Sequence, residues 1–216
     1  MKLADTIRIL ASALSLAVSA QAATLISYLG QPTSNSIQLD TTLQRAATDF
    51  LTGGTVTSVT GVTLNLLNQD TIAHSVLVSL FTDNSGAPGT LVGTFDTPIL
   101  LPATQPDFAD ASATTSGINL APATPYWLVL ALSESVVFNH VNWSVSGNAA
   151  PNAGSVFSGI SATQVKRSTD GGGSYVAFTP GNAKMALTGD AVPEPATAML
   201  LLGGCAVLLR GRNRGR

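Results

Sequence analysis

The chain has little of the chemistry on which most enzymes and many exported domains depend. Its 216 residues include one cysteine, Cys205, and two histidines, His74 and His140. A single cysteine near the C-terminus excludes a disulfide framework, so the fold must be stabilised by its own hydrophobic core. Neither histidine has a histidine or cysteine partner at metal-ligand spacing, so we expect no metal site.

Positive charge is also scarce in the body of the chain. Between residues 23 and 192 there are four basic residues and ten acidic ones, which gives a net charge of −6. Because phosphate backbones are bound by clustered cations, nucleic acid is not an expected partner. The basic residues are Arg45, Lys166, Arg167 and Lys184, and the acidic residues are Asp40, Asp49, Asp70, Asp83, Asp96, Asp107, Asp110, Glu134, Asp170 and Asp190.

Sequence motifs of the common enzyme classes are missing as well. The chain has no Gly-x-Ser-x-Gly elbow, no P-loop and no dinucleotide fingerprint. A glycosidase pair could be sought among Asp107, Asp110 and Glu134, but they fall in predicted loops and turns, where surface solvation is the better explanation. We therefore predict no catalytic residue and no cofactor, and a hydrolase without a local signature stays open as an alternative.

Two further groups of residues admit a functional and a structural interpretation. Asp83-Asn84-Ser85 and Asp170 have oxygens suited to calcium, but their spacing matches no calcium loop, so turn formation is favoured. Four aromatic residues would stack on sugars if exposed, although aromatics in apolar strands more often belong to the core. A carbohydrate-binding module with a defined sugar site therefore remains a second alternative. These aromatic residues are Tyr126, Trp127, Trp143 and Tyr175.

Residues 1–22 have the features of a secretory signal peptide. Two basic residues precede an apolar stretch over residues 9–18, and Ala20-Gln21-Ala22 has small residues at the two positions that a signal peptidase reads. We expect removal of this segment during export, with Ala23 as the first residue of the mature protein.

Residues 192–216 form a predicted membrane tail. Pro193 and Pro195 fix φ and remove two backbone donors, so a helix can begin only at about Ala196. The uncharged segment 196–209 would be about 21 Å long, shorter than the ~30 Å hydrocarbon core of a bilayer. Such a helix is a weak anchor that must thin the bilayer or depend on snorkelling arginines.

An arginine cluster follows this helix and sets its orientation. The positive-inside rule places the C-terminus in the cytoplasm, so the body of the chain lies on the other side of the inner membrane. The cluster consists of Arg210, Arg212, Arg214 and Arg216.

The order of Pro193-Glu194-Pro195, a short apolar helix and terminal arginines resembles the PEP-CTERM sorting signal of Gram-negative bacteria. This resemblance implies that an exosortase, a separate membrane-embedded cysteine protease, recognises the tail and cuts near the triplet. The protein would then be released or re-anchored, and the same resemblance implies association with exopolysaccharide. A plain membrane anchor is the alternative explanation of the tail.

The body, residues 23–190, is predicted to be all-β. Helical periodicity never lasts more than about two turns, and Thr, Ser, Val, Gly and Asn dominate. Val62, Leu64 and Leu66 alternate with polar residues, whereas Tyr126–Leu132 is apolar throughout and should be buried on both faces. About eight to ten short strands at this spacing favour an antiparallel β-sandwich, jelly-roll-like in its topology.

Local details are expected as follows. The turn formers at 83–89 predict a hairpin, and Gly61 is expected to break a strand. Residues 43–50 are expected to form one helical turn. Polar connections are expected over 31–42 and over 98–113, where three prolines argue against a central strand.

Several of these stretches carry a second resemblance. The turn at 83–89, the run Tyr126–Leu130 after a proline, and the turn Ser168–Gly172 are similar to the R type of the choice-of-anchor family of exported domains. The resemblance covers about residues 45–189. It implies a sandwich-like fold and carries over no catalytic residue.

Together these observations predict an exported, non-catalytic β-sandwich protein. It would be anchored transiently in the inner membrane and then reach the cell surface or the extracellular matrix.

Overall fold

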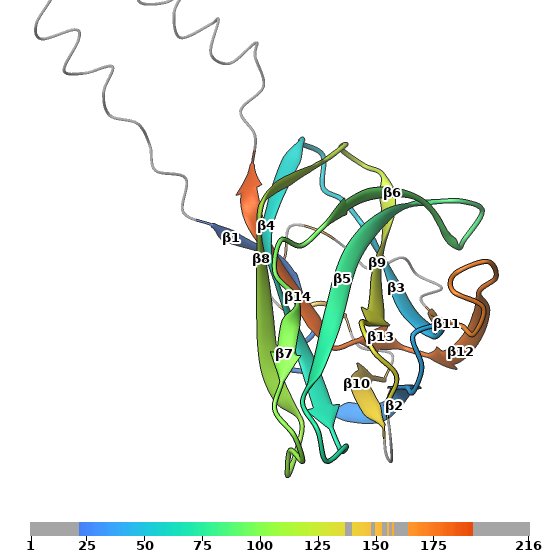
Figure 1. The fold of residues 1–216 in the computed structure, drawn as a ribbon. Coiled ribbons are helices and arrows are strands. Elements are labelled where there is room, and N and C mark those ends of the chain that lie inside the picture. Colours follow the sequence, from blue (N-terminus) through green and yellow to red (C-terminus); the bar gives the residue numbers. More distant parts are fainter. Residues whose placement is uncertain are drawn as a thin grey trace, which may run out of the picture.

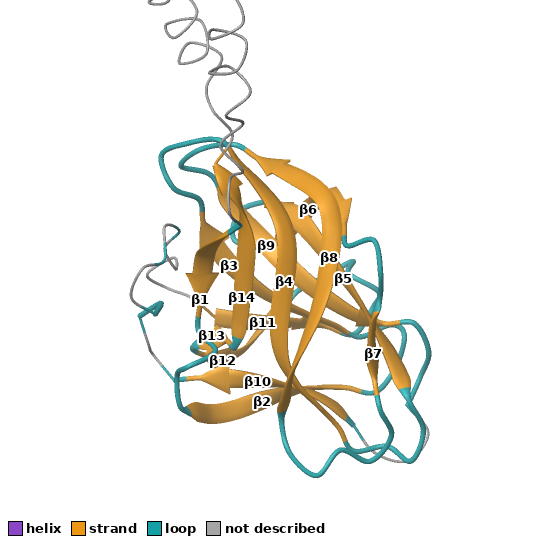
Figure 2. Ribbon diagram, turned by 90° about the vertical axis from the view of Figure 1, so that its left-hand side faces the viewer, coloured by secondary structure: helices purple, strands orange, loops and turns teal. Residues whose placement is uncertain are grey.

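The computed structural model describes residues 22–136, 140–147, 150–152, 155, 157 and 164–191. Over these ranges the chain forms two antiparallel sheets around one core, and no helix occurs in them (Figures 1 and 2). Accordingly, no helix in this part of the chain is long and apolar enough to cross a membrane. The all-β prediction with two antiparallel sheets is confirmed.

The predicted targeting segments fall elsewhere. The signal peptide up to Gln21, the triplet Pro193-Glu194-Pro195, the helix over 196–209 and the terminal arginines all lie outside the described residues.

The first sheet has seven strands in the order β1-β14-β4-β10-β13, with β8 pairing with β4 and β2 with β10. Its longest strands, β4 and β8, pair over most of their length, and β14 and then β10 pair with β4 as well. The bounds are β1 (Ala23–Ser27), β2 (Thr33–Leu39), β4 (Thr57–Asn68), β8 (Ala109–Leu120), β10 (Val141–Ser146), β13 (Asn182–Ala183) and β14 (Met185–Ala191).

The second sheet also has seven strands, in the order β12-β11-β3-β9-β5-β6, with β7 pairing with β5. Its centre is β9, which pairs with β3 on one side and with β5 on the other. The bounds are β3 (Arg45–Leu51), β5 (His74–Asp83), β6 (Pro88–Thr94), β7 (Ile99–Leu101), β9 (Pro125–Leu132), β11 (Gln164–Ser168) and β12 (Val176–Pro180).

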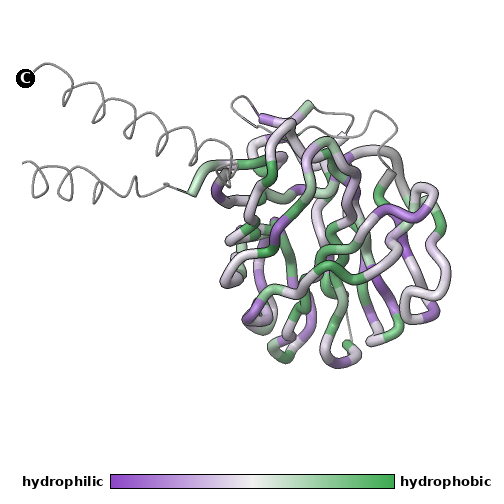
Figure 3. Tube along the Cα trace, turned by 90° about the horizontal axis from the view of Figure 1, so that it is seen from above, coloured by the Kyte–Doolittle hydropathy of each residue, from purple (hydrophilic) through white to green (hydrophobic). Residues whose placement is uncertain are grey.

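The core lies between the sheets and follows the period-2 alternation of the strands. Hydrophobic and hydrophilic residues alternate along several strands in Figure 3. From the second sheet, Leu128, Leu130 and Leu132 face the core, while Trp127 and Val129 lie on the outer face. Both sets are buried, so the prediction that Tyr126–Leu132 is a strand buried on both faces is confirmed.

Three local predictions are wrong. Residues 43–50 form no helical turn, because β3 pairs with β9 along its whole length, and this pairing outweighs a weak local preference. The connection predicted over 31–42 contains β2, which is paired with β10. The connection predicted over 98–113 contains β7, a three-residue apolar strand, and the beginning of β8, whose residues there are small or polar; both are edge strands, so no central strand lies in this stretch.

Gly61 lies within a strand and does not end it. β4 runs from Thr57 to Asn68, and its register shifts between Val59 and Gly61 relative to β8. A Cβ on Gly61 would lie 2.6 Å from Thr188 Oγ1 of the neighbouring strand. The glycine therefore permits a bulge with close packing between β4 and β14.

The two ends of the described fold are neighbours in the first sheet. Ala23 of β1 pairs with Gly189 of β14, and Ala191 at the end of β14 pairs with Thr57 at the start of β4. Both ends therefore leave the fold from adjacent strands at the same end of the sheet (Figures 1 and 2). This end will be called the chain end.

Candidate functional site

A charged cluster surrounds an indole ring on the outer face of the second sheet. We call it the indole cluster; it consists of Asp49, Asp83, Trp127 and Lys166. Trp127 is only 1% exposed, although it points away from the main core. Its Nε1–H donates a hydrogen bond to Asp83 Oδ1 at 2.7 Å, and the Lys166 ammonium lies 5.5 Å from the ring centroid.

Two hairpins bring the members of the indole cluster together. The ammonium of Lys166, on the hairpin of β11 and β12, donates a hydrogen bond to the carbonyl of Gly86 in the turn between β5 and β6. That turn is tight, since Ser85 and Gly86 both have positive φ and lie between hydrogen-bonded Asn84 and Ala87. The turns of the two hairpins lie close together in Figure 1. Lys166 thus links them across the face of Trp127.

Asp49 is the most unusual group of the indole cluster. It is 7% exposed, and its Oδ1 has no hydrogen-bond partner. Burial, together with the Asp83 carboxylate, raises the pKa of Asp49 to about 6, while its own backbone N–H and the Lys166 ammonium act in the opposite direction. Asp49 therefore exchanges its proton in the mildly acidic range.

The Asp49 charge also affects a buried phenol. Burial, and secondarily Asp49, raises the pKa of Tyr28 to about 12. The Tyr28 hydroxyl likewise has no hydrogen-bond partner. Both groups carry a desolvation cost that a simple apolar residue at either position would not have.

The aromatic residues considered for sugar binding are placed in the interior, with one exception. Tyr126 and Trp143 belong to the main core, and Trp127 is covered by its cluster. Tyr175 is half-buried and packs against the small cluster of Ala47, Trp127 and Val129. In these positions, no open ring face is available to a ligand on Tyr126, Trp143 or Trp127.

The two stretches considered for calcium have their carboxylates engaged in their own turns. Asp83 accepts from Trp127 and, through Oδ2, from the backbone N–H of Gly86. Asp170 accepts from the Ser168 hydroxyl and from the hydroxyl and backbone N–H of Ser174, and these bonds hold its pKa well below the usual range. Turn formation accounts for both carboxylates.

Both histidines of the chain pair with an aspartate at the end of the sandwich opposite the chain end. His74 and Asp70 are completely buried, and Nε2–H of His74 donates to Asp70 Oδ2 at 2.8 Å. The other ring nitrogen lies 3.8 Å from Glu134 Oε1. His140 Nδ1 and Asp40 Oδ1 form a second pair, 2.5 Å apart and much more exposed.

Neither pair was predicted from the sequence. His140 directly precedes β10 and has a carboxylate partner. Among the described residues no group of three or more His, Cys, Asp or Glu side chains is arranged to hold a metal ion. Of the carboxylates considered for a glycosidase, Asp110 accepts a hydrogen bond from Asn65 at 2.7 Å, and Glu134 faces His74. The described contacts do not join them into one site.

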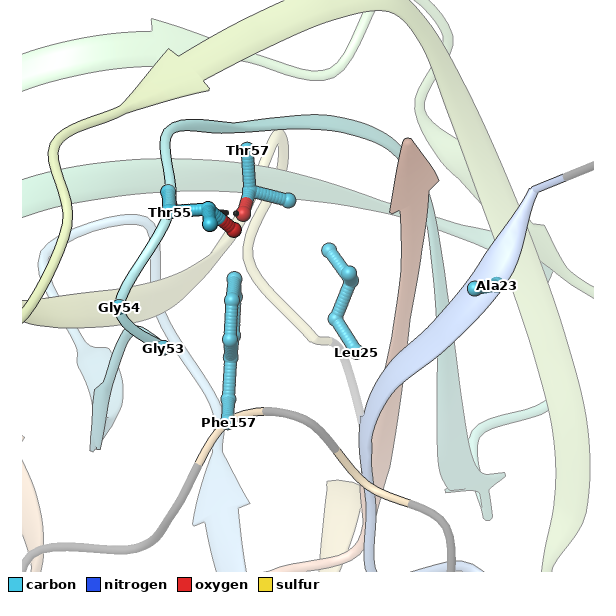
Figure 4. Close-up of a pocket in the computed structure, with 7 residues that line it drawn as sticks. All are labelled: Ala23, Leu25, Gly53, Gly54, Thr55, Thr57 and Phe157. Atoms are coloured by element: carbon cyan, nitrogen blue, oxygen red, sulfur yellow. Dashed lines mark hydrogen bonds between the residues drawn. The ribbon is translucent and has the colours of Figure 1, made fainter. Parts of the chain in front are cut away.

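A pocket of about 330 Å³ opens at the chain end (Figure 4). Figure 4 shows Leu25 and Phe157 facing the side chains of Thr55 and Thr57 across it. The ring of Phe157 stacks on Phe50 with centroids 5.8 Å apart, which fixes one wall. We call it the chain-end pocket; its lining residues are Ala23, Leu25, Gly53, Gly54, Thr55, Thr57 and Phe157.

Comparison with known proteins gives little support to any assignment. No protein-family model matches the chain, and no curated protein matches it. The chain is similar to a chain in the structure of infectious bursal disease virus Gx strain, with 15% identity and a TM-score of 0.27. The similarity covers 91% of this chain and 48% of the viral chain, so the chain spans about half the length of the viral one. A likeness this weak carries no argument.

Proposed function

We propose that this protein is an exported, non-catalytic component of the cell surface or the extracellular matrix, sorted by a PEP-CTERM tail. An exosortase recognises Pro193-Glu194-Pro195, and the helix over 196–209 with its arginines holds the chain in the inner membrane until cleavage. The mature body then associates with exopolysaccharide. Carbohydrate binding at a defined site is the second candidate function.

One structural relationship supports this proposal more than any other. β1 begins at Ala23, directly after the expected signal-peptidase site, and β14 ends at Ala191, two residues before Pro193. Processing at both places leaves every strand pair of the two sheets intact. Because the stability of the body depends on those pairs and the core, removal of both ends should leave a folded domain.

We propose further that the body is a jelly-roll-like sandwich of the choice-of-anchor R type. Its two seven-stranded sheets are built largely from strands that are distant in sequence, such as β3 with β9 and β4 with β14. Such an arrangement is common in antiparallel sandwiches.

The test replaces Pro193-Glu194-Pro195 by three alanines in a host that contains the exosortase. If the tail is a plain anchor, the change lengthens the helix and leaves processing unaltered. Under our proposal the change abolishes cleavage, and the full-length chain accumulates in the inner membrane. Membrane and exported fractions are compared with antibodies against the body. If this variant were cleaved like the wild type, the tail would be an ordinary membrane anchor and the sorting proposal would be wrong.

A second variant tests a different step. Replacing the four terminal arginines by serine removes the positive-inside bias, so the short helix can slip across the membrane. This variant should appear outside the inner membrane with its tail uncut. Retention in the inner membrane would show that the arginines are not needed for anchoring.

A further inference from the structure

The chain-end pocket is lined by groups that need no polar ligand. Thr57 Oγ1 donates to the carbonyl of Thr55 at 3.2 Å, and the backbone N–H of Phe157 donates to the carbonyl of Leu25 at 2.7 Å. In the described part of the chain, no buried side-chain polar atom without a hydrogen bond belongs to this lining. Carbon makes up most of the remaining wall, so a ligand that fills the pocket should be largely apolar.

The pocket also lies where the body meets the predicted membrane tail. Thr57, in the pocket wall, pairs with Ala191 at the end of β14. Residues 192–195 separate Ala191 from the predicted helix, and the five residue steps from Ala191 to Ala196 span at most about 18 Å. The headgroup layer on one side of a bilayer is roughly 5–8 Å thick. In the anchored protein the end of β14, and the pocket beside it, therefore stay within about 18 Å of the start of the predicted helix, close to the headgroup layer.

On the basis of the proposed anchoring, we propose that the chain-end pocket binds the end of a phospholipid acyl chain while the tail is uncut. Apolar walls around about 330 Å³ are in contact with water when the pocket is empty, and an acyl chain removes this contact. The membrane that holds the tail is the nearest source of such chains. Binding holds the body on the bilayer and keeps Pro193-Glu194-Pro195 at the surface, where a membrane-embedded protease acts.

The test uses the exported chain with its tail still attached, purified from cells without exosortase. The protein is placed in phosphatidylethanolamine–phosphatidylglycerol vesicles, in which a trace of the lipid carries a photoreactive diazirine at the end of one acyl chain. After irradiation, the labelled residues are located by mass spectrometry. We expect label on the tail helix and, separately, on Leu25, Phe157 and residues 53–57.

A pair of glycine variants makes the result specific. A Cβ on Gly54 would have no heavy atom within 4 Å, so Gly54→Phe adds a ring to the pocket lining with no clash at its Cβ. Gly147→Phe is the matched control, because its Cβ meets only Ser34, at an ordinary 3.8 Å. The label on the pocket should be lost in Gly54→Phe and kept in Gly147→Phe, with the tail label unchanged in both. Far-UV circular dichroism and thermal unfolding establish that both variants fold.

The possible failures are distinguishable. Label on the tail without label on the pocket in the wild-type protein overturns the acyl-chain site and leaves the sorting proposal standing. Cross-links between the pocket and the chain's own tail, or between two copies, also overturn it. If the tail itself takes no label, the anchoring proposal fails, and the acyl-chain site fails with it.

Discussion

Asp49 of β3 lies directly opposite Trp127 of β9 on the outer face of the second sheet. A buried carboxylate is thus placed beside a buried indole, with Lys166 across the ring and Asp83 on the indole nitrogen. In the indole cluster, burial therefore disfavours the charged form of the Asp49 carboxylate. Its consequences for stability can be measured directly.

The first prediction concerns the pH dependence of stability. The pKa of Asp49 is raised from 3.8 to about 6 in the folded protein. Between these values the native state binds more protons than the unfolded state, so this group lowers stability as pH rises from about 4 to about 6. The full effect is on the order of 3 kcal/mol at pH 7. Asp49→Asn should remove this dependence and be more stable than wild type at pH 7.

Urea unfolding of both proteins from pH 4 to pH 8 checks this prediction. Asp107→Asn is the control, because Asp107 is exposed in a loop and accepts a hydrogen bond from the neighbouring backbone N–H of Phe108. The difference between wild type and Asp49→Asn should grow with pH and level off above about pH 7. If the difference in the free energy of unfolding stayed constant from pH 4 to pH 8, the raised pKa of Asp49 would be contradicted.

The second prediction concerns the cover over Trp127. Lys166→Ala removes the ammonium from the ring face and the bond to Gly86, so Trp127 becomes accessible from that side. Acrylamide should quench tryptophan fluorescence more strongly, and stability should fall by about 0.5–1 kcal/mol. Trp143 is fully buried and supplies the unchanged background. Arg167→Ala, on the opposite face of the same strand, should leave quenching as in wild type, and equal quenching in both variants would refute the contact.

The third prediction compares the two histidines. His74→Ala removes the imidazole that donates to Oδ2 of the completely buried Asp70, and loss of one member of a buried pair typically costs about 3–5 kcal/mol. His140→Ala breaks a pair that is much more exposed, where losses stay below about 1 kcal/mol. Thermal unfolding of the two variants under the same conditions makes the comparison. Similar melting temperatures would mean that the buried pair does not stabilise the fold.

Much of the fold could be predicted from the sequence, and the failures have a common cause. Strand β9 was predictable because its apolar run has no other stable place than the centre of a sheet. β8 was missed because small and polar residues fill an edge strand, where Ile118 and Leu120 alone supply large apolar side chains to the core. Residues 43–50 were misassigned because their conformation is set by pairing with β9, about 80 residues away.

The site was less predictable than the fold. Asp49, Asp83, Trp127 and Lys166 come from four strands, and no local spacing links them. The same holds for the Asp40–His140 pair, whose members are 100 residues apart. Only Asp70 and His74 are close enough in sequence to have been noticed, as residues i and i+4 on either side of a strand boundary.

The central claim is that both ends of the chain are removed around an intact body, and the intact mass of the protein recovered from outside the cell tests it most directly. We expect a chain that begins within about two residues of Ala23 and ends near Pro193-Glu194-Pro195, with any added group visible as extra mass. Recovery of the whole 22.0 kDa chain, from Met1 to Arg216, would contradict the account.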